Sequence, residues 1–230
     1  MKEDLDLQQL ADIGDPFAQD AGAPIRPLDR SRTAASPSPT RARTRALRVI
    51  ALGAAVLCDV GWLLFHTRGN LGQQAFSSVA VGIAIPLVAA AVALAAAVRR
   101  GPRGLGAPAA RIAALAVGAP ILFAAATLVA APPEAGDPLF WRHAVGCMTV
   151  TALLTLGPLA LGLWAFRHGF AAAAGWRTAA IGVAAGALAA TTMSLHCSIT
   201  TAGHVIVGHG LVMIFAGLAG ALLAPTVARS

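Results

Sequence analysis

Residues 144–166 read AVGCMTVTALLTLGPLALGLWAF, a stretch of 23 residues without a charged side chain. At a rise of 1.5 Å per residue, a helix of this length spans about 35 Å, more than the roughly 30 Å of a bilayer's hydrocarbon core. Because lipid offers backbone polar groups no hydrogen-bond partner, such a segment must satisfy them internally, as a helix does. The stretch therefore predicts a transmembrane helix.

Five more apolar runs of about the same length surround this stretch. They occupy residues 46–66, 75–98, 112–131, 178–195 and 204–226. A β-barrel would instead need segments of about ten residues with alternating polarity, and the sequence has none. We therefore expect an all-α membrane protein in which residues 46–230 form a bundle of six transmembrane helices, the fourth over residues 144–166.

The composition agrees with a chain whose solvent is lipid. Of its 230 residues, 57% are apolar, and the mean hydropathy is +0.72. Only 12% are charged, against about 25% in an average soluble domain. So little charge excludes a wholly disordered chain, a coiled coil and a nucleic-acid-binding module. The net charge of +7 is therefore better explained by membrane topology than by direct contact with nucleic acid.

The arginines near the spans lie almost entirely on one side of the predicted membrane. Eleven of them fall on the side of the N-terminus, and only Arg68 and Arg142 fall on the other side. Positively charged loops tend to stay in the cytoplasm, so this pattern places both termini there. An even number of spans agrees, because it puts the two termini on the same side. We expect a multi-pass protein of a bacterial inner membrane, in contact with the lipid bilayer.

Residues 1–45 differ from the rest of the chain because they are polar. Leu7, Leu10 and Ile13 recur at intervals of three in an acidic stretch, which would give a short helix one apolar stripe. Such a short helix is only marginally stable alone in water, but it could fold against a groove on a partner protein. The alternative is that these residues form a disordered leader. Proline, serine and arginine dominate residues 21–45, as in flexible linkers. We expect a largely disordered cytoplasmic segment, too short for a catalytic domain.

Cysteines and histidines gather near the outer ends of the predicted spans. Cys147 lies in the fourth span and Cys197 follows the fifth. Three interpretations of this pair are open: a structural disulfide, a redox- or metal-responsive pair, and small apolar side chains at helix interfaces. Zinc, cadmium and copper(I) suit such thiolate and imidazole ligands. Further candidate ligands for a transition or heavy metal ion are His143, His196, His204 and Cys58.

The spacing of two histidines in the last run bears on a haem site. His204 and His209 are five residues apart, which places them about 140° apart around an α-helix. We therefore expect them not to share a face, and this spacing argues against haem ligation.

Two further features lie within the spans. Asp59 is the only carboxylate inside a predicted span, and an ionisable residue there is a functional candidate. Gly182 and Gly186 form a GxxxG pattern, which allows close helix approach and gives weak support to a homodimer.

The order of several short motifs resembles that of the NrsF-like membrane anti-sigma factors. An acidic N-terminus and PIRPL at residues 24–28 precede six spans, and Cys147 opens the fourth. That span ends in WAFRHG at residues 164–169, and LHC at residues 195–197 precedes His209-Gly210 in the last run. The chain departs from the family pattern at Ser198 and Gly208, where a proline and an aromatic residue are usual.

The resemblance implies a function. The cytoplasmic segment would hold an extracytoplasmic-function sigma factor, and Cys147 and Cys197 would respond to heavy-metal or oxidative stress in the periplasm and so release it. The expected sigma-factor contacts are Leu7, Leu10, Ile13, Pro24, Arg26, Pro27 and Leu28. We expect no enzymatic activity and no direct binding to nucleic acid. Two other classes stay open: a small-solute transporter or permease, and a membrane redox protein that uses haem or quinone.

Overall fold

The computed structural model describes residues 41–66, 76–98, 108–131, 138–167 and 173–229. The predictions for Leu7, Leu10 and Ile13 and for residues 24–28 lie outside the described residues.

Six helices in the described part of the chain are long and apolar enough to cross a membrane, as predicted, and these residues contain no strand. Their bounds fall within five residues of the predicted spans at each end. The last run is divided into three consecutive parts, of which the middle one is a π-helix. The helices are α2 (Arg41–His66), α3 (Phe76–Val98), α4 (Ala109–Ala130), α5 (Phe140–Phe166), α6 (Ala174–His196), α7 (Ala202–Val205), η4 (Ile206–Gly210) and α8 (Leu211–Arg229).

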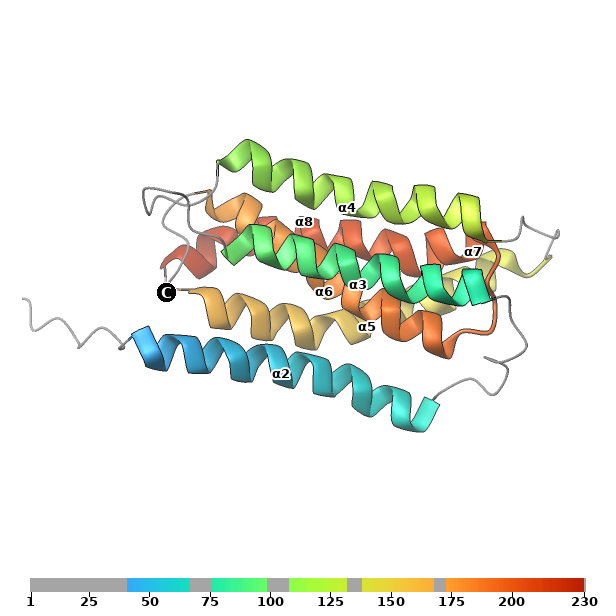
Figure 1. Ribbon diagram of the computed structural model, residues 1–230, viewed down its shortest axis with the longest axis horizontal. Coiled ribbons are helices and arrows are strands. Elements are labelled where there is room, and N and C mark those ends of the chain that lie inside the picture. The colour runs from blue at the N-terminus through green and yellow to red at the C-terminus, as the bar shows by residue number, and fades with distance from the viewer. Residues whose placement is uncertain (1–40, 67–75, 99–107, 132–137, 168–172, 230) are drawn as a thin grey trace, which may run out of the picture. The chain divides into compact units, whose positions relative to one another are not determined.

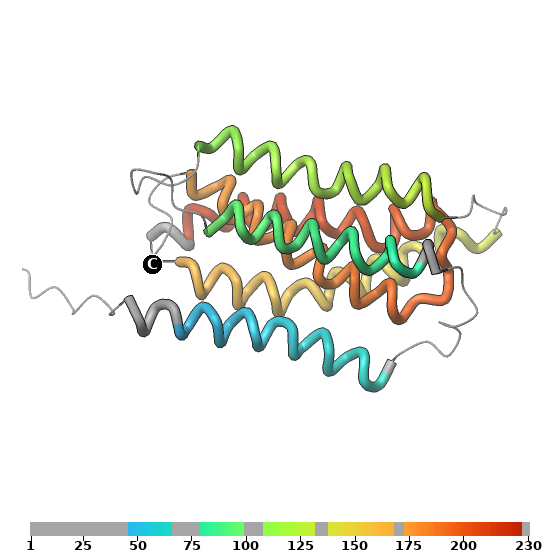
Figure 2. The backbone as a smooth tube through the Cα atoms, in the orientation of Figure 1, coloured from blue at the N-terminus to red at the C-terminus, as the bar shows by residue number. Residues whose placement is uncertain are grey.

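Helix α6 forms the centre of the bundle. Nearly all of its residues between Arg177 and Met193 are buried, and it packs mainly against α8 and α3 (Figure 2). Most of the buried positions are alanine, glycine or threonine. Small side chains let helix backbones approach closely, which is how helices gain contact energy in lipid.

The GxxxG pattern of α6 is used inside this chain. A Cβ atom on Gly182 would collide with the carbonyl group of Ala216 in α8, and one on Gly186 would lie 2.7 Å from Met213 Cα. The two glycines therefore face α8, and α8 covers this surface of α6. A homodimer stays a prediction, and this motif no longer supports it.

Successive spans run in opposite directions, so the bundle has two chemically different ends (Figure 1). Arg48, Arg111, Arg167 and Arg177 lie near the helix termini at one end, which we call the arginine end. The buried Arg177 closes part of it by donating a 2.6 Å hydrogen bond to the carbonyl oxygen of Ala97. The opposite end carries Cys147 and Cys197 and is called the cysteine end.

Candidate functional site

Four ligand-type side chains converge at the cysteine end. The sulfur or nitrogen atoms that they offer all lie within 4.8 Å of one another. Cys147 comes from α5, Cys197 follows α6, His204 lies in α7 and His209 in η4. This Cys/His cluster therefore joins the ends of three spans that are separate in the sequence.

The two thiols face each other. Their Sγ atoms are 3.6 Å apart, and no disulfide joins the two cysteines in this structure. Cys197 caps α6: its backbone N–H donates to the Met193 carbonyl, and its extended φ and ψ of −74° and 131° turn the chain out of the helix. This turn directs the Cys197 side chain toward α5, where it is buried.

Both histidine rings are buried, with only 1% of each residue exposed. His204 Nε2 lies 3.3 Å from the Sγ atom of Cys197, a hydrogen-bonding distance for this pair. The rings of His204 and His209 meet edge to face, with their centroids 5.6 Å apart.

The expectation that His204 and His209 do not share a face is wrong, because the helix between them is not an α-helix. Residues 206–210 form a π-helix, which closes its hydrogen bonds over five residues instead of four and holds more residues per turn. Five residues then complete little more than one turn, and the second ring returns beside the first. π-Helical turns often occur at functional sites.

Thr151 of α5 contacts the backbone of the π-helix. Its hydroxyl group is fully buried and lies 2.7 Å from the Cys147 carbonyl oxygen and 3.2 Å from the Gly208 carbonyl oxygen. Gly208 itself allows this approach, since a Cβ atom there would lie 3.2 Å from Cys147 Cβ and 3.3 Å from the Ala144 carbonyl oxygen.

The surroundings of Cys197, which lies between two spans, favour its thiolate form. The hydrogen bond from the Cys147 thiol, assisted by His204 and by the proximity of His209, lowers the pKa of the Cys197 thiol against the opposing effect of burial. A thiolate is the nucleophilic and metal-binding form of cysteine. The surroundings of Cys197 therefore favour both nucleophilic reaction and metal binding.

The structure does not bring every candidate ligand into the cluster. Cys147, Cys197 and His204 meet as a group, whereas Cys58 and His143 are exposed on α2 and α5. His196 turns to α2, where its ring lies 6.0 Å from that of Trp62. His209 was missed as a ligand because an α-helical spacing was assumed, and nothing in the local sequence signals the π-helix.

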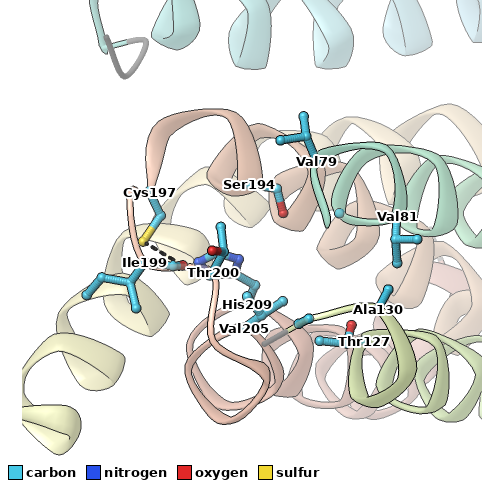
Figure 3. Close-up of a pocket in the computed structure, with 12 residues that line it drawn as sticks. Val79, Val81, Thr127, Ala130, Ser194, Cys197, Ile199, Thr200, Val205 and His209 are labelled. Atoms are coloured by element: carbon cyan, nitrogen blue, oxygen red, sulfur yellow. Dashed lines mark hydrogen bonds between the residues drawn. The ribbon is translucent and has the colours of Figure 1, made fainter. Parts of the chain in front are cut away.

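A small cavity adjoins the cluster on the side of α3 and α4 (Figure 3). Its volume is about 20 Å³, and Cys197 and His209 form part of its wall. Hydroxyl-bearing side chains line it as well, from Thr127, Ser194 and Thr200. The remaining lining is mostly apolar, and a cavity of this size has room for about one water molecule.

Helix α2 packs against α5 and α6 through polar or aromatic contacts near both of its ends. Near the cysteine end, Trp62 meets His196, the residue just before Cys197. One turn earlier the buried Asp59 lies close to Thr192 of α6, although neither of its carboxyl oxygens is hydrogen-bonded to a described residue. At the arginine end, the guanidinium of Arg48 lies 4.8 Å from the Phe166 ring centroid of α5.

Fold and site together define a class: a polytopic helical membrane protein in which two thiols and two buried imidazoles gather in one cluster at an end of the bundle. The family model for NrsF, negative regulator of sigma F, matches residues 31–229. The chain therefore belongs to the NrsF family, and the resemblance seen in the sequence is confirmed. The family description identifies a negative regulator whose partner is a sigma factor. No curated protein and no solved structure matched the chain in these comparisons.

Proposed function

We propose that this protein holds an extracytoplasmic-function sigma factor at a bacterial inner membrane and releases it when a metal or redox signal reaches the Cys/His cluster. The observation that carries the proposal is the meeting of Cys147 and Cys197, with their Sγ atoms 3.6 Å apart, in a member of a sigma-regulator family. These cysteines are 50 residues apart in the chain. A close pair of thiols supports a response to oxidants and to thiophilic metals alike.

The arrangement of charge supports an orientation for this function. Arginines collect at the end where α2, α4 and α6 begin, and positive charge near span ends favours the cytoplasmic side. The segment before α2 then lies in the cytoplasm, where a sigma factor is found, and the Cys/His cluster faces the periplasm. Signal and partner are thus on opposite sides of the membrane.

The contacts of α2 provide a route between these two sides. This helix directly follows the segment that we expect to bind the sigma factor. Its Trp62 packs on the neighbour of Cys197, and its Arg48 packs on Phe166 at the far end of the helix that carries Cys147. A shift of α5 or α6 at the cluster would therefore alter the support of α2 near both ends.

The required free energy is modest. A signal moves a two-state equilibrium only by its difference in affinity for the two states, and a change of about 5- to 150-fold needs about 1–3 kcal/mol. Metal–thiolate bonds or a disulfide supply at least that much.

Co-purification of the full-length protein tests the partner. A C-terminally tagged chain, extracted from its native membrane in mild detergent, should retain a sigma factor that mass spectrometry identifies. A variant with Leu7, Leu10 and Ile13 all changed to Ser should lose it while the bundle of residues 41–229 stays folded. A wild-type sample that retains no sigma factor would contradict the proposal.

Release of the partner tests the sensing step. The Cys147→Ser, Cys197→Ser double variant should keep the sigma factor bound under cadmium or peroxide stress, as measured by a sigma-dependent reporter. Cys58→Ser is the matched control, because Cys58 is exposed and outside the cluster, and it should respond like the wild type. Normal induction of the double variant would refute the sensing step.

A further inference from the structure

We propose that Cys147, Cys197, His204 and His209 form a tetrahedral binding site for one divalent ion of the zinc class, such as zinc or cadmium. The inference deepens the proposed function, on which it rests for its regulatory meaning, because it names the ligand that these cysteines recognise. The ion is bound by the chain's own side chains, and His209 is the fourth ligand.

The spacing of the four side chains suits this coordination. With bonds of about 2.3 Å to sulfur and about 2.0–2.1 Å to nitrogen, a tetrahedral zinc site separates two sulfurs by about 3.8 Å and a sulfur from a nitrogen by about 3.6 Å. The corresponding separations here are 3.6 Å between the Sγ atoms and 3.3 Å from Cys197 Sγ to His204 Nε2. No pair in the set is farther apart than 4.8 Å, so small side-chain rotations complete the site.

Charge selects a divalent ion. Cysteine binds metals as a thiolate and histidine as a neutral imidazole, so the four ligands together carry two negative charges. Cys197 and both histidines are buried, and an uncompensated charge in such a place is unfavourable. A divalent ion neutralises the two thiolates, whereas copper(I) leaves one negative charge. The two thiol protons pass to solvent when the ion binds.

The number of ligands makes this a closed site. Structural and sensory zinc sites take four protein ligands, whereas catalytic ones leave a position open for water or substrate. The cavity of about 20 Å³ touches Cys197 and His209 but holds only about one water molecule. The cavity therefore leaves no room for a substrate beside the four ligands (Figure 3).

Metal binding and disulfide formation exclude each other at this site. The bound ion keeps the two sulfurs about 3.8 Å apart, whereas a disulfide requires about 2.05 Å. A two-electron oxidant such as a peroxide would take both electrons from the two metal-bound thiolates and be reduced to water with two protons from solvent. The sulfurs then join as a disulfide, and the ion leaves as the divalent cation. The same four residues would thus report both metal level and oxidation.

Cobalt titration of the full-length protein tests the site. We expect the reduced protein, in detergent micelles, to bind one cobalt(II) ion per chain with the intense visible bands of tetrahedral thiolate coordination. Zinc or cadmium should displace it. His209→Ala and His204→Ala should each weaken binding at least ten-fold, whereas His143→Ala and His196→Ala should leave it unchanged. Circular dichroism and size exclusion would verify that each variant is folded.

Specific results would overturn the proposal. They are weak octahedral cobalt bands, unchanged affinity in a folded His209→Ala variant, or binding of copper(I) with none of zinc or cadmium. Sigma-factor co-purification separates this failure from failure of the proposed function. Sigma binding with a cysteine-dependent response but no such metal site would refute the inference alone. A four-ligand site in a protein that captures no sigma factor would refute the function alone.

Discussion

Replacement of Thr151 by valine should loosen the Cys/His cluster while leaving the four ligand side chains themselves unchanged. Valine keeps the shape of threonine but removes the hydroxyl that lies 3.2 Å from the Gly208 carbonyl oxygen in η4. Hydrogen bonds between membrane helices are worth about 0.6 kcal/mol on average and about 1.7 kcal/mol at most. We expect the free energy of unfolding to fall by this amount, which corresponds to about a 3- to 20-fold change in the unfolding equilibrium.

The assay is reversible unfolding in mixed detergent micelles, followed by circular dichroism, together with cobalt titration of the same variant. Thr155→Val is the matched control. Thr155 is buried one turn further along α5, and its hydroxyl donates to the Thr151 carbonyl oxygen of its own helix. The control should lose less stability and keep its cobalt affinity, whereas Thr151→Val should lose affinity as the π-helix shifts. Equal effects of the two substitutions on both measurements would refute this reasoning.

Three further predictions concern other parts of the molecule. Gly186→Ala should destabilise the bundle by about 1–3 kcal/mol, because the new Cβ would lie 2.7 Å from Met213 Cα and overpack the interface. Gly118→Ala is the control and should leave the stability unchanged, because nothing lies within 4 Å of its Cβ. Similar unfolding curves for the two variants would contradict this prediction. Cys147→Ala removes the strongest influence that lowers the Cys197 pKa, so the thiolate absorbance of Cys197, measured in a Cys58→Ser background, should appear at higher pH than in the wild type. Asp59→Leu should leave the thermal stability unchanged or raise it. The buried carboxyl oxygens lack hydrogen bonds to described residues, and an apolar side chain avoids the cost of removing a carboxyl group from water. A clear loss of stability would contradict this and show that the carboxyl group has a partner.

The helices were predictable because lipid imposes one strong rule. A segment of about 20 apolar residues has to be a helix there, so the bounds of α3 fall within one residue of the predicted span. Helix α6 instead begins four residues before its predicted span and takes in the polar Arg177. Depth within the membrane was predictable for the same reason. It correctly suggested that Cys147, Cys197 and His204 lie near one end of the bundle.

The membership of the cluster was only partly predictable. Depth alone does not say which way a side chain turns around its helix, so it could not separate His196, which faces Trp62, from His204, which faces Cys197. His209 depended on a local change in helix type that is set by packing. Tertiary contacts, such as the one from Thr151 to the Gly208 carbonyl oxygen, stabilise this geometry, and they cannot be read from neighbouring residues.

The π-helix also fixes the rotational setting of the whole of α8. Each residue of an α-helix advances the chain by about 100° around the axis, so the extra residue held in the π-helical turn rotates everything after it by about that angle relative to α7. If residues 206–210 relaxed to an α-helix, Met213 and Ala216 would turn away from Gly186 and Gly182, which they now contact. The close packing of α6 against α8 in the middle of the bundle therefore fixes the rotation of α8 about its axis. Through that rotation it also fixes the position of His209 at the cysteine end.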